Sequence, residues 1–326
     1  MPNDSVILAA DIGGTNARFM LARAADAALD VVATAKLRVA AHRSFEDACA
    51  AFLSGQPQVD IDRACIAVAG PVVGRTARLT NSPWSVDADA VAARFGIRDV
   101  QLCNDFAAAA AGIGDLDASS MLVVQQGNAS PGGARLVIGA GTGLGVAYVL
   151  GDGAAPRVIG SEGGHVGFAP ASEEQIMLLR WLVPTLGRVT AEHLVSGAGL
   201  VRLYHFASGP AAAIPDDVRE QGASAVTRRF GEGDAVARKA LRMFIAIFGA
   251  VAGDHALSIV ATGGVYLAGG IAPRFAEQLA DGSFAAAFRA KGRHEDLMAR
   301  MPVWLVCNDG LGLNGAARCA LALPVR

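Results

Sequence analysis

Asp11-Ile12-Gly13-Gly14-Thr15-Asn16 and Gly139-Ala140-Gly141-Thr142-Gly143-Leu144-Gly145 are the two stretches that decide the fold of this chain. Each lies between two apolar runs of the β type, at 6–10 and 19–22 around the first and at 136–138 and 146–150 around the second. This pattern predicts two β-hairpins with glycine-rich tips. Main-chain N–H groups in such a tip can approach an anion closely, and Thr15 and Thr142 add hydroxyl donors. Together the hairpins predict a phosphate site, although each alone is also typical of a tight turn without a ligand.

The two commoner glycine-rich phosphate motifs are excluded. A P-loop requires a lysine after its glycines, and no lysine follows either turn. The second turn has spacing similar to a dinucleotide-binding fingerprint, but a strand follows it where that motif requires a helix.

The composition indicates a protein of two domains without nucleic-acid or membrane partners. Its 326 residues allow two cores of ordinary size. The longest apolar run, 243–253, is shorter than the ~18 residues of a membrane span, so we expect a buried helix there. A net charge of −2 without a basic cluster argues against nucleic acid, and the first residues show no secretory signal. We therefore expect a cytoplasmic location.

The five cysteines are predicted to be reduced thiols that are buried as small apolar groups. They are odd in number and scattered, and no pair has the spacing of zinc ligands: Cys49, Cys65, Cys103, Cys307 and Cys319.

Each half of the chain opens with a hairpin and continues with helices and strands. In the first half, the pattern predicts strands at 33–39, 63–69 and 100–103, with helices from 44, at 87–95 and from 106. The second half carries a strand at 121–124, helices at 173–182, 191–205 and 234–257, and a strand from 263 into a glycine turn. The alternation indicates an α/β fold with mixed sheets.

Six motifs in order resemble the bacterial ATP-dependent glucokinases, which belong to the sugar kinase, heat-shock chaperone and actin superfamily. Besides the two hairpins they are L-C-N-D-F, S-E-G-G-H-V-G-F-A-P, A-E-H-L-V-S-G and L-A-G-G-I, and they span Asp11 to Ile271. The resemblance implies the two-domain actin-like ATPase (ribonuclease H-like) fold, with a cleft between the domains. We place the small domain at 1–112 and 315–326, where a C-terminal helix returns to it, and the large domain at 113–314. The implied activity moves the γ-phosphoryl of ATP to the 6-hydroxyl of glucose, giving glucose 6-phosphate and ADP as the first step of glucose catabolism.

Asn104 and Asp105 stand where a strand turns into an alanine-rich helix. Either residue is also a preferred helix N-cap, and the local pattern alone favours that interpretation. The resemblance implies that Asp105 is the general base on the sugar hydroxyl and that Asn104 binds a neighbouring hydroxyl. Since the start of a helix favours negative charge, we expect a lowered pKa for Asp105.

Glu162, His165 and Glu192 are the remaining candidates on the sugar side. Glu162 and His165 could hold a metal if they lay on one helix, but Gly163 and Gly164 between them disfavour a helix, and a structural loop pair is the other alternative. Glu192 follows Thr190, a candidate N-cap, and its position is also typical of a first-turn acid. The resemblance implies that all three residues contact sugar hydroxyls, with Asn81 as a further contact.

The resemblance also assigns a nucleotide side, with ATP and Mg²⁺. Asp11 is placed to hold Mg²⁺ through water, although an Asx-turn cap on the hairpin would explain the same residue. The residues implied to contact the phosphates or the adenosine are Gly13, Gly14, Thr15, Asn16, Gly141, Thr142, Gly143, Gly269 and Gly270.

Three alternatives stay open. The chain could be a kinase for another hexose, an actin-type or chaperone-type ATPase without a sugar substrate, or a sugar sensor without catalysis. The presence of Asp105 disfavours the sensor. Glucose and ATP are the expected partners, and a homodimer is left open.

Overall fold

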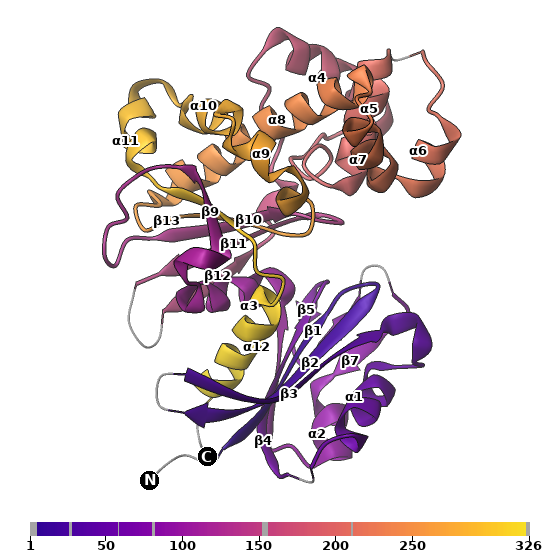
Figure 1. The fold of residues 1–326 in the computed structure, drawn as a ribbon, viewed down its shortest axis with the longest axis vertical. Helices are drawn as coiled ribbons and strands as arrows, with labels where there is room; N and C mark the ends of the chain where they lie inside the picture. Colours follow the sequence, from indigo (N-terminus) through magenta and orange to yellow (C-terminus); the bar gives the residue numbers. More distant parts are fainter. Residues whose placement is uncertain are drawn as a thin grey trace. The chain divides into compact units, whose positions relative to one another are not determined.

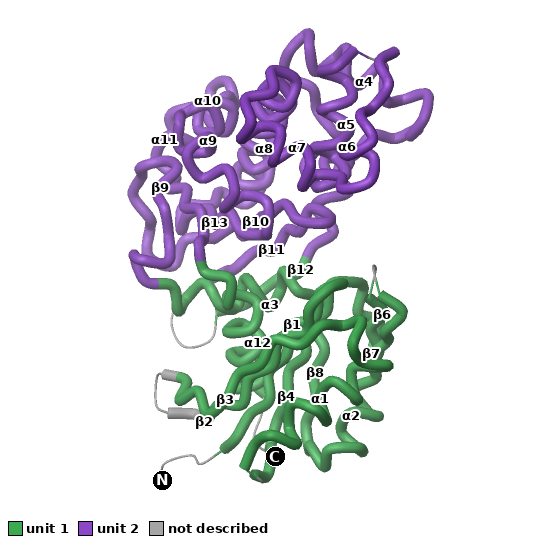
Figure 2. Tube along the Cα trace, turned by 45° about the vertical axis from the view of Figure 1, so that its right-hand side comes forward, with its two compact units in different colours: residues 1–116, 154–160, 308–326 green, residues 117–153, 161–307 purple. Residues whose placement is uncertain are grey.

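The computed structural model describes residues 5–25, 28–57, 59–79, 82–151, 156–209 and 211–323. The chain divides into two compact units (Figures 1 and 2). Unit 1 comprises residues 1–116, 154–160 and 308–326, and unit 2 comprises residues 117–153 and 161–307. The chain therefore leaves unit 1, builds unit 2 and returns. The sequence predicts domains at 1–112 with 315–326 and at 113–314. These bounds stay a prediction, because the units are compact parts of the structure and not domains shown to fold alone.

Unit 1 is built on a five-stranded sheet with the order β3-β2-β1-β4-β8. Strand β1 pairs antiparallel with β2 across the first glycine turn and parallel with β4, and β4 is parallel to β8. The strands are β1 (Val6–Ile12), β2 (Asn16–Ala25), β3 (Ala28–Arg38), β4 (Ile61–Val68) and β8 (Asp99–Asn104). The predicted hairpin and mixed sheet are confirmed.

The helices of unit 1 and a small second sheet complete it. The small sheet has the order β5-β6-β7. These elements are α1 (Phe45–Ser54), β5 (Val72–Val73), β6 (Thr76–Arg78), β7 (Ser85–Asp87), α2 (Ala88–Phe95), α3 (Asp105–Gly112) and α12 (Leu311–Ala322), with 3₁₀ turns η1 (Val39–Ala41) and η2 (Ile113–Asp115). Ser44 and Asp87 cap α1 and α2 by accepting hydrogen bonds from backbone N–H groups, as their positions predict.

Both faces of the first sheet are buried, and β1 divides its side chains between them. Val6 and Leu8 belong to a core that includes Phe45 of α1. Ile7 and Ala9 belong to a second core that is closed by small residues of α12. Since successive strand residues point to opposite faces, a strand covered on both sides is continuously apolar, which explains the unbroken apolar run before the first turn.

Helices α3 and α12 approach each other at backbone distance. A Cβ on Gly315 would overlap the carbonyl oxygen of Ala108, and a Cβ on Gly112 would lie 2.7 Å from the carbonyl oxygen of Leu311. The far end of α12 is also fixed, because the buried Arg63 guanidinium donates to the Leu323 carbonyl at 2.6 Å. Helix α12 is therefore held along its length against the sheet and α3.

The second large sheet has six strands in the order β12-β11-β10-β13-β14-β9, and all of them belong to unit 2 except β12, of which only Ser161 does. Its second glycine hairpin is β10 paired antiparallel with β11, and β10 is parallel to β13. The strands are β9 (Met121–Gln125), β10 (Arg135–Ala140), β11 (Leu144–Leu150), β12 (Arg157–Ser161), β13 (Gly264–Ala268) and β14 (Val303–Val306). In each unit, the strand before the glycine turn therefore pairs antiparallel with the strand after it and parallel with a third strand. Strands β11-β10-β13 repeat the arrangement of β2-β1-β4.

The core of unit 2 is centred on α8, which contains the long apolar run. Its Phe248 packs edge-on against Phe284 of α10, with ring centroids 5.4 Å apart. The helices are α4 (Glu173–Leu186), α5 (Gly197–Ser208), α6 (Asp216–Gln221), α7 (Ala223–Gly231), α8 (Ala235–Ile259), α9 (Ala276–Ala280), α10 (Ser283–Arg289) and α11 (Glu295–Arg300), with 3₁₀ turns η3 (Ala118–Ser120), η4 (Gly163–His165), η5 (Ala272–Phe275) and η6 (Gly292–His294). The predicted buried helix at 243–253 is confirmed.

Two predicted helix boundaries are wrong. Helix α4 continues through Pro184 to Leu186, because a proline in the last turn removes only one hydrogen bond. No helix begins near Ala191: the N–H groups of Ala191 and Glu192 instead bond to the carbonyls of Val166 and Gly164. The helix starts at Gly197, where Ser196 caps it.

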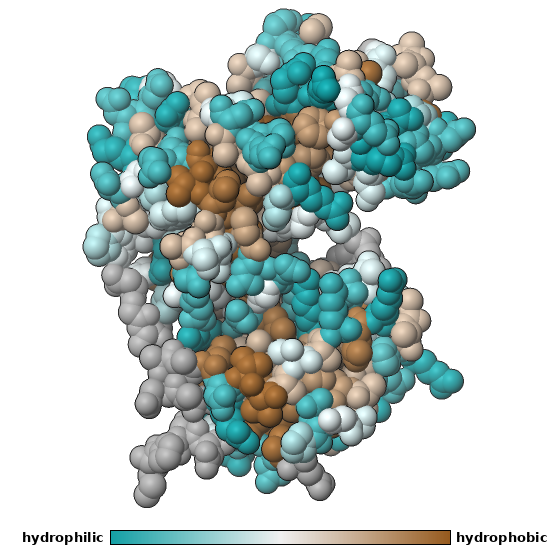
Figure 3. All heavy atoms as spheres, viewed as in Figure 1, coloured by the Kyte–Doolittle hydropathy of each residue, from teal (hydrophilic) through white to brown (hydrophobic). Residues whose placement is uncertain are grey.

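Among the described residues, no helix is long and apolar enough to cross a membrane. On the face shown in Figure 3, hydrophilic residues cover much of the helical part of unit 2, and hydrophobic residues appear between them.

The contact between α3 and α12 predicts that Gly315→Ala destabilises the protein by about 1–3 kcal/mol, since overpacking displaces backbone that cannot yield freely. The measurement is the free energy of unfolding in urea. Gly114→Ala is the matched control in the same unit, because a Cβ there meets nothing within 4 Å. Equal stability of the two variants would contradict the packing described.

Candidate active site

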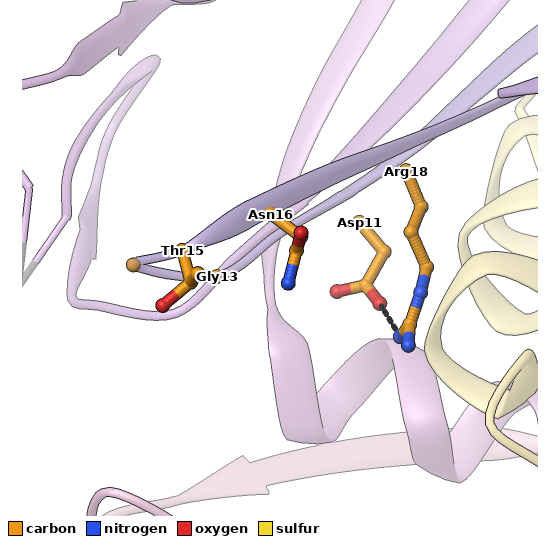
Figure 4. Close-up of a pocket in the computed structure, with 6 residues that line it drawn as sticks. Asp11, Gly13, Thr15, Asn16 and Arg18 are labelled. Carbon is orange, nitrogen blue, oxygen red and sulfur yellow. Dashed lines mark hydrogen bonds and ion pairs between the residues drawn. The ribbon is translucent and has the colours of Figure 1, made fainter. Parts of the chain in front are cut away.

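The first glycine turn borders a cavity of about 240 Å³ that is lined by Asp11, Gly13, Gly14, Thr15, Asn16 and Arg18. The tip is closed by the Gly13 N–H, which donates to the Asn16 carbonyl at 3.0 Å. Thr15 and Gly14 are exposed, while Asn16 is half-buried. Figure 4 shows the Asp11 and Arg18 side chains turned toward each other, with Asn16 beside Asp11. The turn thus presents backbone and small polar groups to an open cavity next to a carboxylate.

The Asp11 carboxylate is held by unit 1 on two sides. It accepts a hydrogen bond from Arg18 at 3.4 Å. The Gly13 N–H, which an Asx-turn cap would bond, donates instead to the Asn16 carbonyl, so Asp11 does not cap the turn. A Cβ on Gly312 would lie 3.1 Å from its carboxyl carbon, which places Asp11 against the first turn of α12. A helix N-terminus favours an anion. Burial nevertheless raises the pKa of Asp11, and the Arg18 charge opposes that shift.

Asn104 is the N-cap of α3, as the sequence predicts. Its Oδ1 accepts from the N–H groups of Phe106 at 2.9 Å and Ala107 at 3.4 Å. Asp105 is the first residue of α3, and its Oδ1 also accepts from the Phe106 N–H at 2.9 Å. The carboxylate is consequently fixed at the end of β8, within unit 1 like Asp11.

The expected lowered pKa of Asp105 is wrong. Burial, and after it the negative charge of Asp11, raises the pKa of Asp105 from 3.8 to about 6, against hydrogen bonds that favour the ionised form. A helix terminus contributes only about 0.3–1 kcal/mol, whereas burial can move a carboxyl pKa by several units. The larger effect decides, and Asp105 is a stronger base than an exposed aspartate.

The tip of the second hairpin is tied to Glu192. One carboxylate oxygen of Glu192 accepts from the Leu144 N–H at 2.9 Å, and a Cβ on Gly143 would overlap that oxygen. The carbonyl of Gly141 accepts from the Gly197 N–H at the start of α5 at 2.9 Å. Glu192 is therefore not the first-turn acid that its sequence position suggested. Its contact with the hairpin needs a glycine at 143.

Glu162, His165 and Glu192 come together in unit 2. His165 Nε2 lies 3.8 Å from a Glu162 oxygen, and His165 Nδ1 lies 3.9 Å from a Glu192 oxygen. The carboxylates therefore flank opposite edges of one imidazole, so a single ion could not take all three groups. The Glu162 and His165 side chains are 81% and 57% exposed, which leaves their polar atoms available to a ligand.

The Gly269-Gly270 turn lies in unit 2. Gly269 and Gly270 follow β13, and the Ile271 N–H after them donates to the Ala140 carbonyl at 3.2 Å. This turn therefore lies next to the second hairpin. Asn81 is outside the described residues.

Sequence reasoning missed Arg18, Gly312 and His255. Arg18 neutralises part of the Asp11 charge, and Gly312 gives Asp11 room. His255 of α8 is buried beneath the Gly163 turn and bonds to the Tyr148 hydroxyl at 2.9 Å. Arg18 could have been found, because it is a charged residue between the apolar residues Ala17 and Phe19 of the predicted strand. Gly312 and His255 lie in helices far along the chain, and the local sequence gives no sign that they lie near the candidate residues.

Known proteins are similar to this chain over nearly its whole length. The chain matches the Glucokinase family over residues 8–323. It is 38% identical to the glucokinase of Hahella chejuensis, with 95% of both chains covered, and 40% identical to that of Synechocystis sp., with 83% of this chain and 82% of that one covered.

A solved structure extends the likeness to the fold. The crystal structure of a glucokinase from an Antarctic psychrotroph superposes with a TM-score of 0.87 at 32% identity, covering 98% of this chain and 99% of that one. The fold is thus the predicted two-domain actin-like ATPase fold, and the chain belongs to the glucokinase family.

Proposed function

We propose that this protein transfers the γ-phosphoryl group of ATP to the 6-hydroxyl of glucose, giving glucose 6-phosphate and ADP. The observation that carries the proposal is the Asp105 carboxylate, fixed at the end of β8 with a pKa of about 6, in the same unit as the glycine-turn cavity. Membership of the glucokinase family supports it.

Asp105 would act as the general base on the sugar hydroxyl. A base works best when its pKa lies near the operating pH, and a pKa of about 6 keeps Asp105 mostly ionised at neutral pH while making it a better proton acceptor than an ordinary aspartate. Because phosphoryl transfer has a loose transition state, the proton need leave the hydroxyl only late. The N-cap bonds of α3 would hold the base in place.

The residues around the first turn fit a nucleotide phosphate with Mg²⁺. Asp11 offers a hard oxygen ligand to a cavity that is also lined by Gly13, Gly14 and Thr15, and Mg²⁺ prefers carboxylate and water oxygens. Bound there, the ion would neutralise charge on the phosphates, a task that no P-loop lysine performs in this chain. The phosphate contacts would come from Gly13, Gly14, Thr15, Asn16, Gly141, Thr142 and Gly143, with Gly269 and Gly270 near the adenosine.

Glu162, His165 and Glu192 would bind the sugar, with Asn104 and Asn81. Carboxylates accept hydrogen bonds from hydroxyls and an imidazole can donate or accept one, so this set suits a neutral polyol. It disfavours an anionic substrate, because Glu162 and Glu192 would repel it.

The decisive test of function is a coupled assay of purified protein with ATP, Mg²⁺ and a panel of hexoses. Preference for glucose is expected, whereas a higher kcat/KM for another hexose would reassign the substrate. ATP hydrolysis without any dependence on sugar would favour the actin-type or chaperone-type ATPase. A cytoplasmic location and a homodimer stay predictions.

Asp105→Asn is expected to lower kcat by about 10²-fold or more, since the base is lost while the side chain keeps its shape. Steady-state kinetics at saturating glucose and ATP measure this.

The same variant carries its own folding control. Between pH about 4 and 6 the folded chain holds a proton on Asp105 that the unfolded chain lacks, so this group lowers stability as pH rises through that window. Asp105→Asn should therefore be more stable than the parent at neutral pH, by at most about 3 kcal/mol. Near-normal turnover would remove Asp105 from the mechanism.

The pH profile of kcat/KM is expected to fall on the acid side with an apparent pKa near 6, because protonation of Asp105 removes the base. Removing the negative charge of Asp11 by Asp11→Asn should shift that limb to lower pH in the remaining activity. An acid limb near pH 4 in the parent enzyme would show that its base is a solvent-exposed carboxylate.

Glu192→Gln is expected to raise the KM for glucose by about 10-fold or more, because a hydrogen bond to a charged acceptor contributes about 1.5–3 kcal/mol. Glu173→Gln, at the start of α4 in the same unit, is the control and should change nothing. If the KM for ATP rose while that for glucose stayed constant, Glu192 would instead serve to position the hairpin.

A further inference from the structure

Three cysteines that are far apart in the sequence meet in unit 1, behind the Asn104-Asp105 corner. Cys65 lies on β4, Cys103 on β8 and Cys319 on α12. Their sulfur atoms all lie within 4.8 Å of one another, and Cys65 and Cys103 have Sγ atoms 3.5 Å apart. The spacing of the cysteines in the sequence did not indicate this proximity. Their predicted burial is confirmed for Cys49 and Cys65, but it is wrong for Cys307, which is exposed. Strand pairing and the return of α12 create a proximity that local spacing cannot show.

The distances fit a shared metal ion. Metal–sulfur bonds of about 2.3 Å place the sulfurs of a trigonal site about 4.0 Å apart and those of a tetrahedral site slightly closer. The Cys65–Cys103 sulfur separation of 3.5 Å lies just below this value, and the other two separations do not exceed 4.8 Å, so little movement is needed to bring three sulfurs to one ion. In the part of the chain that the structure describes, this is the one group of three or more metal-ligating side chains with ligand atoms so close together.

A disulfide between Cys65 and Cys103 fits the backbone less well. Cys65 pairs with Gln101 in the parallel register, so Cys103 lies two residues further along its strand. Two residues of rise and one strand spacing put the Cα atoms about 8 Å apart, beyond the usual range for a disulfide.

The surroundings also suit a soft cation. Cys65 is fully buried, while Cys103 and Cys319 are half-buried, so the cluster can be reached from solvent. The residues of the core around the cluster are apolar, among them Ala67 and Ala316.

We propose that Cys65, Cys103 and Cys319 bind one soft, thiophilic metal ion of the Zn²⁺, Cd²⁺ or Cu⁺ class through three thiolates. Thiolate ligands select such ions over Mg²⁺, so the cluster would not compete for the ion used in phosphoryl transfer. The proposal is independent of the sugar substrate.

The test uses the full-length protein, reduced and freed of metal, with Cd²⁺ as the probe. Titration followed by desalting should retain one Cd²⁺ per chain and give an ultraviolet sulfur-to-cadmium charge-transfer band. Cys319→Ala should weaken binding by about 10-fold or more, since even loss of a group behind a metal ligand costs that much. Cys65→Ala should do the same.

Cys49→Ala and Cys307→Ser are the matched controls, because these cysteines lie outside the cluster. Both should leave the band and the stoichiometry unchanged. Competition of the Cd²⁺ complex with Zn²⁺ and with Cu⁺ then identifies the preferred ion, and displacement by either supports the site.

Two results would overturn the proposal. One is a charge-transfer band that persists at full strength in both Cys319→Ala and Cys65→Ala, with the circular dichroism of each variant unchanged. The other is the absence of any retained Cd²⁺ in the reduced parent protein, including the case in which mass spectrometry finds Cys103 and Cys319 joined as a disulfide before reduction.

Discussion

One stripe of small residues along α12 determines the arrangement of several parts of unit 1. Gly312 faces Asp11, Gly315 meets the backbone of α3 at Ala108, and Cys319 joins the two strand cysteines. Positions three and four apart lie on one face of a helix, so a single stripe makes all three contacts. A larger side chain anywhere on it would push α12 away from the sheet. The carboxylate of the first hairpin, the start of α3 and the thiol cluster therefore share one support.

That support also determines the electrostatics of the candidate base. Asp105 stands at a helix start, which by itself favours ionisation, yet its pKa is raised. Close packing around α3 removes water from the carboxyl group, and the charge of Asp11 adds to the effect. Arg18 offsets part of the Asp11 charge without abolishing it. Under the proposed function, these two carboxylates of different environment would have different tasks, Asp11 to hold a cation and Asp105 to accept a proton.

Much of this could be predicted from the sequence, because the deciding signals are local. The hairpins, the caps Ser44, Asp87 and Asn104, and the buried α8 all follow from short-range patterns. What the sequence could not predict depends on distant segments. The local pattern at Glu192 is typical of the first turn of a helix. The segment is not helical, because the N–H groups of Ala191 and Glu192 bond to the carbonyls of Val166 and Gly164, and these partners cannot be recognised from the local sequence. The pKa of Asp105 and the meeting of Cys65, Cys103 and Cys319 depend in the same way on tertiary packing.

The path of the chain has a consequence for how the protein is made. The core face of unit 1 that contains Ile7, Ala9 and Ala67 is completed by Leu313 and Ala317, which follow all of residues 117–307 in the chain. At ~5–20 residues per second, a ribosome needs about 10–40 s to synthesise that stretch, and for this time the first sheet has one apolar face without its helix. All of unit 2 has been synthesised by residue 307, before the last segment of unit 1, so unit 2 can complete its folding first. The nascent chain should thus acquire its structure from the middle outward, and the first-made sheet is the part that most needs protection from aggregation.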